Sequence, residues 1–221
     1  MEKIVILSDC IFTRSGLETL LRPEAYIFST SSFKQCKSYL IQQQDGDIDL
    51  IVLSIRYGGI DALVQLASLL RCYHPSCKVL LDPGSASIPM LCFYLDCLNA
   101  KTGLIDLTLP LPKLKWFITR VICGQVVLST RDLLGLKRLT VRERTVLLGL
   151  MKELCADDIA RTLMLSIKTI SYYKRSGLCK LGARNFQDLL LPVVKRYPRG
   201  YSSIQPRSAS YVQECQYALT A

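Results

Sequence analysis

The sequence predicts two domains of different class, an α/β domain over residues 1–123 and an all-α domain over residues 138–196. In the first half, short apolar runs alternate with helical periods, whereas only helical periodicity follows residue 138. The charge divides in the same way, because residues 1–123 hold 12 Lys and Arg against 11 Asp and Glu, and residues 138–199 hold 13 against 5. A chain of 221 residues with half of them hydrophobic can bury two cores.

The first half reads as five strands separated by helices. Residues 3–8 form a continuous apolar run, which is typical of a strand buried on both faces, and residues 49–54 form the clearest one. Alternation of this kind predicts a doubly wound parallel sheet with helices on both faces. The expected elements are strands at 3–8, 25–29, 49–54, 78–81 and 103–105, and helices at 12–21, 33–43, 60–70, 88–98 and 113–123.

Order and spacing over most of residues 1–123 resemble the receiver domain of bacterial response regulators, best at Ser8-Asp9, Arg14-x-Gly16-Leu17 and Asp49-Leu-Ile-Val-Leu. The resemblance implies a phosphoacceptor aspartate after the third strand, an acidic pair that binds Mg²⁺ after the first, and a lysine after the fifth. Here the phosphoacceptor position is Ser54, only Asp9 remains of the pair, and Asp106 lies near the lysine position. Because the charge of a transferring phosphoryl group would be uncompensated, we expect no aspartyl phosphorylation. The resemblance leaves pairing with another receiver as the expected use of this domain.

The second half opens with a predicted helix after a linker at residues 124–137. Thr140 and Glu143 have the spacing of a capping box, which predicts the start of this helix. Apolar residues at helical spacing give it a core face, namely Val146, Leu147, Leu150 and Met151.

Two further helices lie close together between residues 157 and 181. The first carries Ile159, Ala160 and Leu163 at helical spacing, and Ser166 is expected to cap the second. The inward stripe of the second helix is Ile170, Gly177 and Leu181, and its opposite face carries Lys168, Ser171, Tyr172 and Arg175. Small polar, aromatic and basic side chains on one face suit the major groove of DNA, so the pair is predicted to be a helix-turn-helix.

This half resembles the four-helix DNA-binding domain of the LuxR/FixJ type. The matching motifs are Leu139-Thr-x-Arg-Glu, Ile159-Ala-x-x-Leu, Leu165-Ser-x-x-Thr-Ile-Ser and Lys180-Leu-Gly-Ala-Arg. The resemblance implies phosphate contacts from Lys168 and Thr169, base contacts from Ser171, Tyr172 and Arg175, and backbone contacts from Lys174 and Lys180. Gly177 replaces an aliphatic residue of the family. We expect the missing side chain to cost the module about 1–2 kcal/mol of burial and about 1 kcal/mol of helix propensity, which would weaken DNA binding by the chain alone.

Other functional classes have little support. Ten cysteines and one histidine lack the spacing of a zinc site, so we expect no metal and no cofactor, and the cysteines are expected to be reduced core residues. No nucleophile elbow or phosphate-binding glycine loop suggests an enzyme or a small-molecule substrate. With no signal sequence and no apolar run long enough for a membrane helix, we expect a protein of the bacterial cytoplasm, associated with the nucleoid when DNA-bound. Residues 197–221 are expected to form a flexible tail.

The combined prediction is a phosphorylation-independent transcriptional regulator that binds double-stranded promoter DNA. Among LuxR-type proteins it looks most like the auxiliary regulators of the RcsA/BglJ group, which implies action as a homodimer or as a heterodimer with a phosphorylatable regulator such as RcsB. Two alternatives remain open at this point: an interaction protein that sequesters its partner without binding DNA, and a regulator gated by phosphorylation. The operons, the sign of regulation and the half-site are not predicted.

Overall fold

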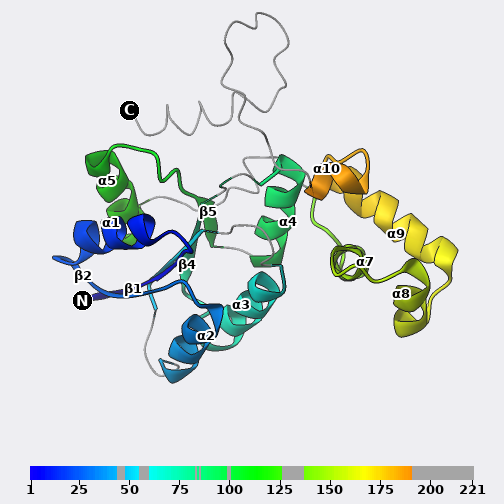
Figure 1. The fold of residues 1–221 in the computed structure, drawn as a ribbon, viewed down its shortest axis with the longest axis horizontal. Coiled ribbons are helices and arrows are strands. Elements are labelled where there is room, and N and C mark those ends of the chain that lie inside the picture. Colours follow the sequence, from blue (N-terminus) through cyan, green and yellow to red (C-terminus); the bar gives the residue numbers. More distant parts are fainter. Residues whose placement is uncertain are drawn as a thin grey trace, which may run out of the picture.

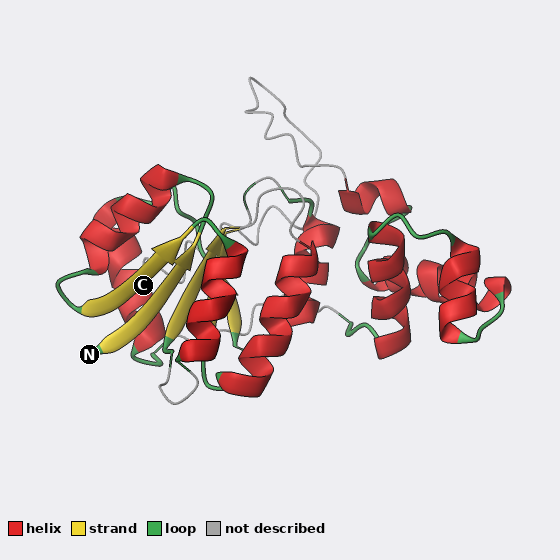
Figure 2. Cartoon of the chain, turned by 60° about the horizontal axis from the view of Figure 1, so that its bottom comes forward, coloured by secondary structure: helices red, strands yellow, loops and turns green. Residues whose placement is uncertain are grey.

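The computed structural model describes residues 1–43, 48–54, 60–82, 84, 86–98, 101–125 and 137–190. Most of the predicted linker and all of the predicted tail lie outside these residues. The described part contains an α/β domain and a helical domain, which lie side by side in Figure 1 and are separated by secondary structure class in Figure 2. The predicted fold class is confirmed.

The α/β domain is built on a five-stranded parallel sheet with the strand order β2-β1-β3-β4-β5. Each observed element agrees with its predicted range to within three residues. In chain order the elements are β1 (Glu2–Leu7), α1 (Ile11–Leu21), β2 (Ala25–Thr30), α2 (Phe33–Gln42), β3 (Leu50–Ser54), α3 (Ile60–Tyr73), β4 (Lys78–Asp82), α4 (Ile88–Leu98), β5 (Thr102–Leu104) and α5 (Leu111–Ile122).

Alternate residues of the central strands point to opposite faces of the sheet, as the strand period requires. Ile4 and Ile6 of β1 pack with α1 and α5, and Val5 and Leu7 pack with α2, α3 and α4. Both faces of the sheet are therefore covered by helices, which explains why its strands read as continuous apolar runs.

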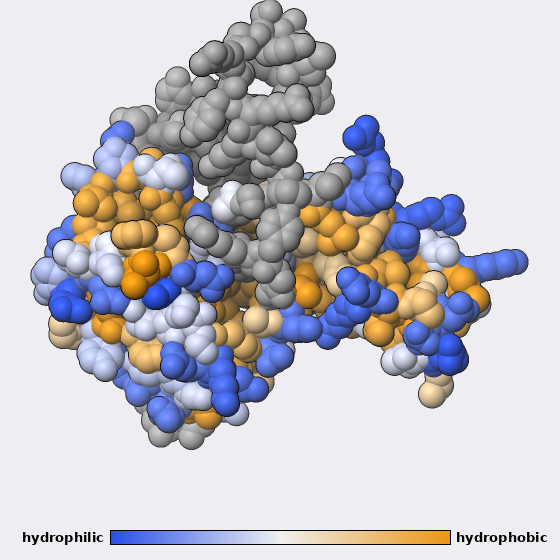
Figure 3. Space-filling view, viewed as in Figure 1, coloured by the Kyte–Doolittle hydropathy of each residue, from blue (hydrophilic) through white to orange (hydrophobic). Residues whose placement is uncertain are grey.

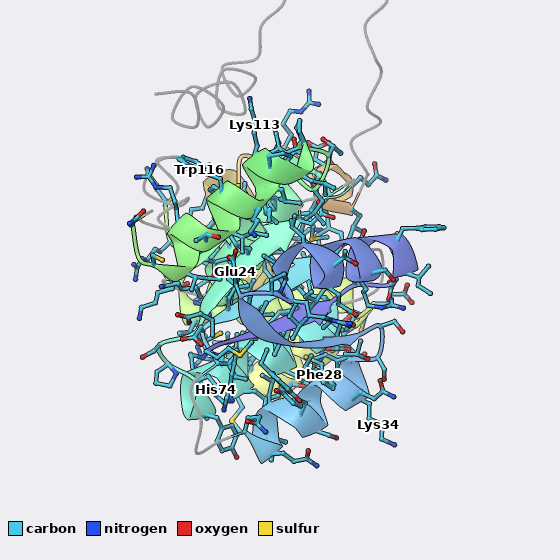
Figure 4. The ribbon with its side chains drawn as sticks, turned by 90° about the vertical axis from the view of Figure 1, so that its left-hand side faces the viewer. Glu24, Phe28, Lys34, His74, Lys113 and Trp116 are labelled. Atoms are coloured by element: carbon cyan, nitrogen blue, oxygen red, sulfur yellow. The ribbon has the colours of Figure 1, made fainter. Side chains whose placement is uncertain are left out.

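Side-chain contacts tie β2 and α3 to α2 at one end of the domain. The rings of Phe28 and Tyr39 are stacked with centroids 3.9 Å apart. His74 is buried, and its Nε2 lies 2.9 Å from the carbonyl oxygen of Leu40. Figure 4 places Phe28 and His74 near this helix, far from Trp116 on α5.

The cysteines follow the prediction only in part. Cys36, Cys77, Cys92 and Cys97 are buried core residues, and burial raises the pKa of the Cys36 and Cys77 thiols to about 12. The prediction is wrong for Cys72, Cys123, Cys155 and Cys179, which are exposed. Cys155 has a local reason, because its Sγ accepts the N–H of Asp158 at 3.4 Å and so caps a helix.

The helical domain consists of α7 (Val141–Met151), α8 (Ala156–Leu163), α9 (Ile167–Lys180) and the short α10 (Phe186–Leu190). Thr140 and Glu143 form the predicted capping box at the start of α7. Val146, Ile159, Ala160 and Ile170 make a small core between α7, α8 and α9. The helix α10 was expected only through the family resemblance, because five residues are too few to show a helical period.

Gly177 has a different role from the one expected. It is buried in α9 where α7 packs against it, and a Cβ added there would lie 2.9 Å from Cδ1 of Leu147. The expectation of a missing aliphatic contact is therefore wrong, because the close approach of α7 brings Leu147 into that space. Glycine leaves room for the Leu147 side chain, which fills the space that a side chain of α9 would otherwise occupy.

Replacement of Gly177 by leucine should lower the free energy of unfolding by about 1–3 kcal/mol, because the added side chain overpacks the α7–α9 contact. Chemical denaturation of the two proteins measures the difference. Gly16→Leu is the matched control, because Gly16 lies on the exposed side of α1 with no atom within 4 Å of an added Cβ. If both variants behave alike, the close contact at Gly177 is not a packing constraint.

Candidate nucleic-acid interface

The helix-turn-helix is formed by α8, α9 and the turn between them. Met164 ends α8 in the left-handed conformation at φ 54°, and this turns the chain toward α9. Ser166 then caps α9 as predicted, since its Oγ accepts the N–H of Thr169 at 3.1 Å. Ile170, Gly177 and Leu178 are the buried residues of α9, so the orientation of this helix is fixed by its contacts with α7 and α8.

The opposite face of α9 is exposed. It carries Lys168, Ser171, Tyr172 and Arg175, the four residues that the periodicity had placed together. Tyr172 is 61% exposed and meets the ring of Tyr173 edge to face, with centroids 5.7 Å apart. Strongly hydrophilic side chains project from the helical domain in Figure 3. This face can therefore present a hydroxyl, an aromatic ring and two cations to a ligand at the same time.

The other three predicted residues have intramolecular contacts at the edges of this face. Thr169 is half-buried, and its hydroxyl is 2.8 Å from that of Ser166. Lys174 is half-buried with its Nζ 5.7 Å from the ring centroid of Phe186. Lys180 forms an ion pair with Glu143 at 2.7 Å. For these three residues the DNA contacts stay predictions, and Lys180 has a structural role that the sequence did not reveal.

Glu143 is the centre of this structural role. Its carboxylate is 4% exposed and accepts hydrogen bonds from the Thr140 N–H, the Ser176 hydroxyl and the Lys180 ammonium, at 2.6–2.7 Å. Burial alone would raise the pKa of Glu143, but the hydrogen bonds from Lys180, Ser176 and Thr140 outweigh it and lower the pKa to about 2. Glu143 thereby ties the start of α7 to the C-terminal half of α9.

The sequence predicted the capping box between Thr140 and Glu143, but not the contacts of Glu143 with Ser176 and Lys180. The capping box is a local pattern of four residues, whereas Ser176 and Lys180 lie more than thirty positions from Glu143. The available signal was their spacing of four along α9, which places both on one face of the helix.

Ser54 lies at the end of β3, opposite Asp82 at the end of β4. Its hydroxyl donates a hydrogen bond to Oδ2 of Asp82 at 2.9 Å, and Oδ1 of Asp82 accepts the N–H of Gly84 at 3.2 Å. Asp9 follows β1 and is exposed, and Asp106 follows β5 with Thr108 as its hydrogen-bond partner. Asp9, Ser54 and Asp106 therefore lie at the carboxyl edge of the sheet as predicted, and Ser54 pairs there with Asp82.

The family model described as "Bacterial regulatory proteins, luxR family" matches residues 137–192. Its range covers α7, α8, α9 and α10, and therefore includes the exposed face of α9. Residues 137–192 are a LuxR-family helix-turn-helix domain. The four-helix composition expected from the resemblance is confirmed by this match and by the observed helices.

Several solved structures of two-domain regulators are similar to the chain over 86% of its length. A Salmonella typhimurium RcsB response regulator is 20% identical with a TM-score of 0.48, and the match covers 98% of that chain. RcsB from Salmonella enterica serovar Typhimurium bound to the promoter rprA is 21% identical with a TM-score of 0.48 over 99% of its chain. Full-length FixJ from B. japonicum is 20% identical with a TM-score of 0.43 over 94% of its chain. No curated protein matches.

Among the described residues, no group of three or more His, Cys, Asp or Glu side chains is placed to hold a metal ion. Within the same residues, none of the helices has the length and apolar content to cross a membrane.

Substitution of Glu143 by glutamine should remove part of the acid sensitivity of the protein. A carboxyl group whose pKa falls from 4.5 to about 2 on folding contributes stability above pH 4.5 that is lost as the pH falls toward 2. We expect the variant to lose roughly 2–3 kcal/mol at neutral pH and to show a flatter pH dependence in that window.

Urea unfolding between pH 2 and pH 7 measures this difference. Glu153→Gln is the control, because it removes an exposed carboxylate from the same domain. An acid limb in the Glu143→Gln variant as steep as that of the wild type would contradict the assignment.

Proposed function

We propose that this protein is a transcriptional regulator that binds double-stranded promoter DNA through α9, without aspartyl phosphorylation, as one member of a pair joined through residues 1–123. The exposed face of α9 in a LuxR-family helix-turn-helix carries the proposal. The RcsB structures that are similar to this chain include complexes with promoter DNA and dimers on DNA. DNA binding and pairing are proposed for this chain by analogy with them.

On DNA, each residue of the exposed face of α9 would make the contact that its chemistry allows. Arg175 can donate two hydrogen bonds to a guanine edge, and Ser171 tolerates several bases. The ring of Tyr172 can contact a thymine methyl group, and Lys168 lies near the helix start where phosphates are met. Thr169 and Lys174 stay proposed phosphate contacts at the edges of this face. Lys180 would have to leave Glu143 to reach DNA, so it is the weakest member of the proposed set.

Phosphorylation independence is supported by the Ser54–Asp82 pair. Ser54 cannot form an acyl phosphate, and the carboxylate of Asp82 lies within 2.9 Å of its hydroxyl. An incoming phosphoryl group would meet this negative charge and, after β5, the carboxylate of Asp106 in place of a cation. Both charges oppose the transfer.

Pairing is supported by apolar side chains on the outer surface of α1 and around α5. Phe12 is 85% exposed, Ile11 60%, Leu111 59% and Trp116 42%. Figure 3 shows an apolar area over α1 and α5, and Figure 4 places Lys113 and Trp116 on α5 at the edge of the domain. Exposed aromatic and aliphatic side chains of this size are typical of protein interfaces. A second copy of the chain or an RcsB-like regulator is the proposed occupant.

The sequestering alternative loses its best support, because the side chain of Leu147 fills the space beside Gly177.

Arg175→Ala should weaken binding to a cognate promoter by about 1–3 kcal/mol and reduce its preference over unrelated DNA. Lys168→Ala should weaken binding to all DNA sequences to a similar extent. It should also reduce, by about 1, the slope of the logarithm of the binding constant against the logarithm of the salt concentration. Fluorescence anisotropy over a salt series measures both, with the protein alone and mixed with an RcsB-like regulator.

The control is Arg184→Ala, which removes the same charge from a 91% exposed side chain of the same domain that lies outside α9. If Arg175→Ala and Arg184→Ala lose the same DNA affinity, the face of α9 proposed to contact DNA is placed wrongly. Selective binding only in the mixture would favour the heterodimer over the homodimer.

Incubation with acetyl phosphate and Mg²⁺ should leave both the mass of the protein and its DNA affinity unchanged. Intact-mass spectrometry at neutral pH detects an acyl phosphate as a labile gain, and a phosphorylatable receiver treated in parallel is the positive control. A stoichiometric gain on Asp9, Asp82 or Asp106 would overturn phosphorylation independence.

A further inference from the structure

The helix α4 is apolar on all sides. Its sequence, Ile-Pro-Met-Leu-Cys-Phe-Tyr-Leu-Asp-Cys-Leu, contains one charged residue, Asp96, and every residue from Cys92 to Leu98 is buried. A helix that covers only a sheet needs one apolar face, so α4 must be covered on a second side. In Figure 1 it lies between the sheet and the helical domain, beside α10.

The second cover of α4 is the helix-turn-helix domain. The apolar core around α3 and α4 continues without a break into Leu139, Leu147, Leu178 and Leu189 of that domain. Ser87, directly before α4, donates a hydrogen bond to the carbonyl oxygen of Leu189 at 2.9 Å. The two domains thus share one core.

Asp96 is the polar centre of this shared core. Its side chain is 6% exposed, Oδ1 accepts the N–H of Leu139 at 3.3 Å, and Oδ2 lies 3.1 Å from Nε of Arg144. A buried carboxylate is destabilising unless charged and hydrogen-bonding partners surround it. Because Leu139 and Arg144 belong to the DNA-binding side, they reach Asp96 only when that domain is docked in this position.

A second ion pair lies farther out on the same side. Lys152, just after α7, is 2.5 Å from Asp61 at the start of α3. Both side chains are about half exposed, so this pair contributes less than a buried one. It adds a further point of contact between the domains, and contacts at separate points restrict rotation of one domain against the other.

Docking of this kind leaves the face of α9 free. The polar contacts described above join the domains through Leu139, Arg144, Lys152 and Leu189, whereas Lys168, Ser171, Tyr172 and Arg175 are exposed. The contact therefore sets the direction in which α9 projects without covering it.

We propose that Asp96 is a positioning residue for DNA recognition. Through Arg144 and Leu139 it fixes the helix-turn-helix domain on α4, so that a pair of chains joined through residues 1–123 presents its two α9 helices at one spacing. The DNA part of this statement rests on the proposed function, whereas the docking part does not.

The docking part is tested by backbone ¹⁵N relaxation on the full chain. In the wild type, amides of both domains should report one common rotational correlation time. In Arg144→Ala, the apolar contacts still hold the domains together, so amides of the helical domain should report a larger amplitude of motion relative to the α/β domain, while the amide spectrum of each domain keeps its dispersion. Arg142→Ala removes the same charge from an exposed position of α7 and should give the relaxation rates of the wild type. Independent tumbling of the wild type, or wild-type relaxation rates in Arg144→Ala, would overturn the docking role.

The DNA part is tested on duplexes that the wild-type protein selects from a random pool, alone or with an RcsB-like regulator. Insertion of half a helical turn between the two half-sites should weaken wild-type binding by at least about tenfold, because the second contact is lost. In Asp96→Asn and Arg144→Ala the penalty should shrink to about twofold, with affinity for a single half-site unchanged.

If the pool yields no selected sequence, the proposed function fails. The docking of the two domains is then still decided by the relaxation experiment. A spacer penalty as large in the variants as in the wild type would overturn the positioning role.

Discussion

The rest of the structure depends on the burial of α4 on two sides. A helix with one charge in eleven residues cannot face water, so its outer side needs a protein cover. The helix-turn-helix domain supplies that cover through α7 and α10, and the core of the α/β domain extends into it. Asp96 adds directional contacts to this apolar one, because its buried carboxylate lies 3.1 Å from Nε of Arg144 and accepts the Leu139 N–H.

The orientation of α9 follows from two constraints on α7. Gly177 lets α7 approach closely enough for Leu147 to occupy the space of a missing side chain. Glu143 then joins the capped start of α7 to Ser176 and Lys180 in α9 through a buried, charged network. With the inner side of α9 fixed in this way, its outer side is free to carry function, and there the basic and aromatic residues gather. Packing and charge thus separate a buried structural face from an exposed basic and aromatic face on one helix.

The carboxyl edge of the sheet carries Ser54 and Asp82 at the ends of two neighbouring strands. The hydroxyl of Ser54 donates a hydrogen bond to Asp82, so these two polar side chains are partnered within the protein. The five parallel strands behind them are covered by helices on both faces. Exposed aromatic and aliphatic side chains lie on α1 and around α5, and the proposed pairing would use this surface.

The sequence by itself determined the elements, both classes of domain, the capping residues Thr140 and Ser166, and the exposed face of α9. These features depend on periodicity and on contacts within one turn of helix, and both involve residues that are close together in the sequence. It did not determine the pairing of Glu143 with Lys180, the bond between Ser54 and Asp82, the close contact at Gly177, or the docking on Asp96. Each of these joins residues 28 to 48 positions apart, or depends on how closely two helices approach. Such distances are decided by the packing of the whole core, so only the tertiary structure could reveal them.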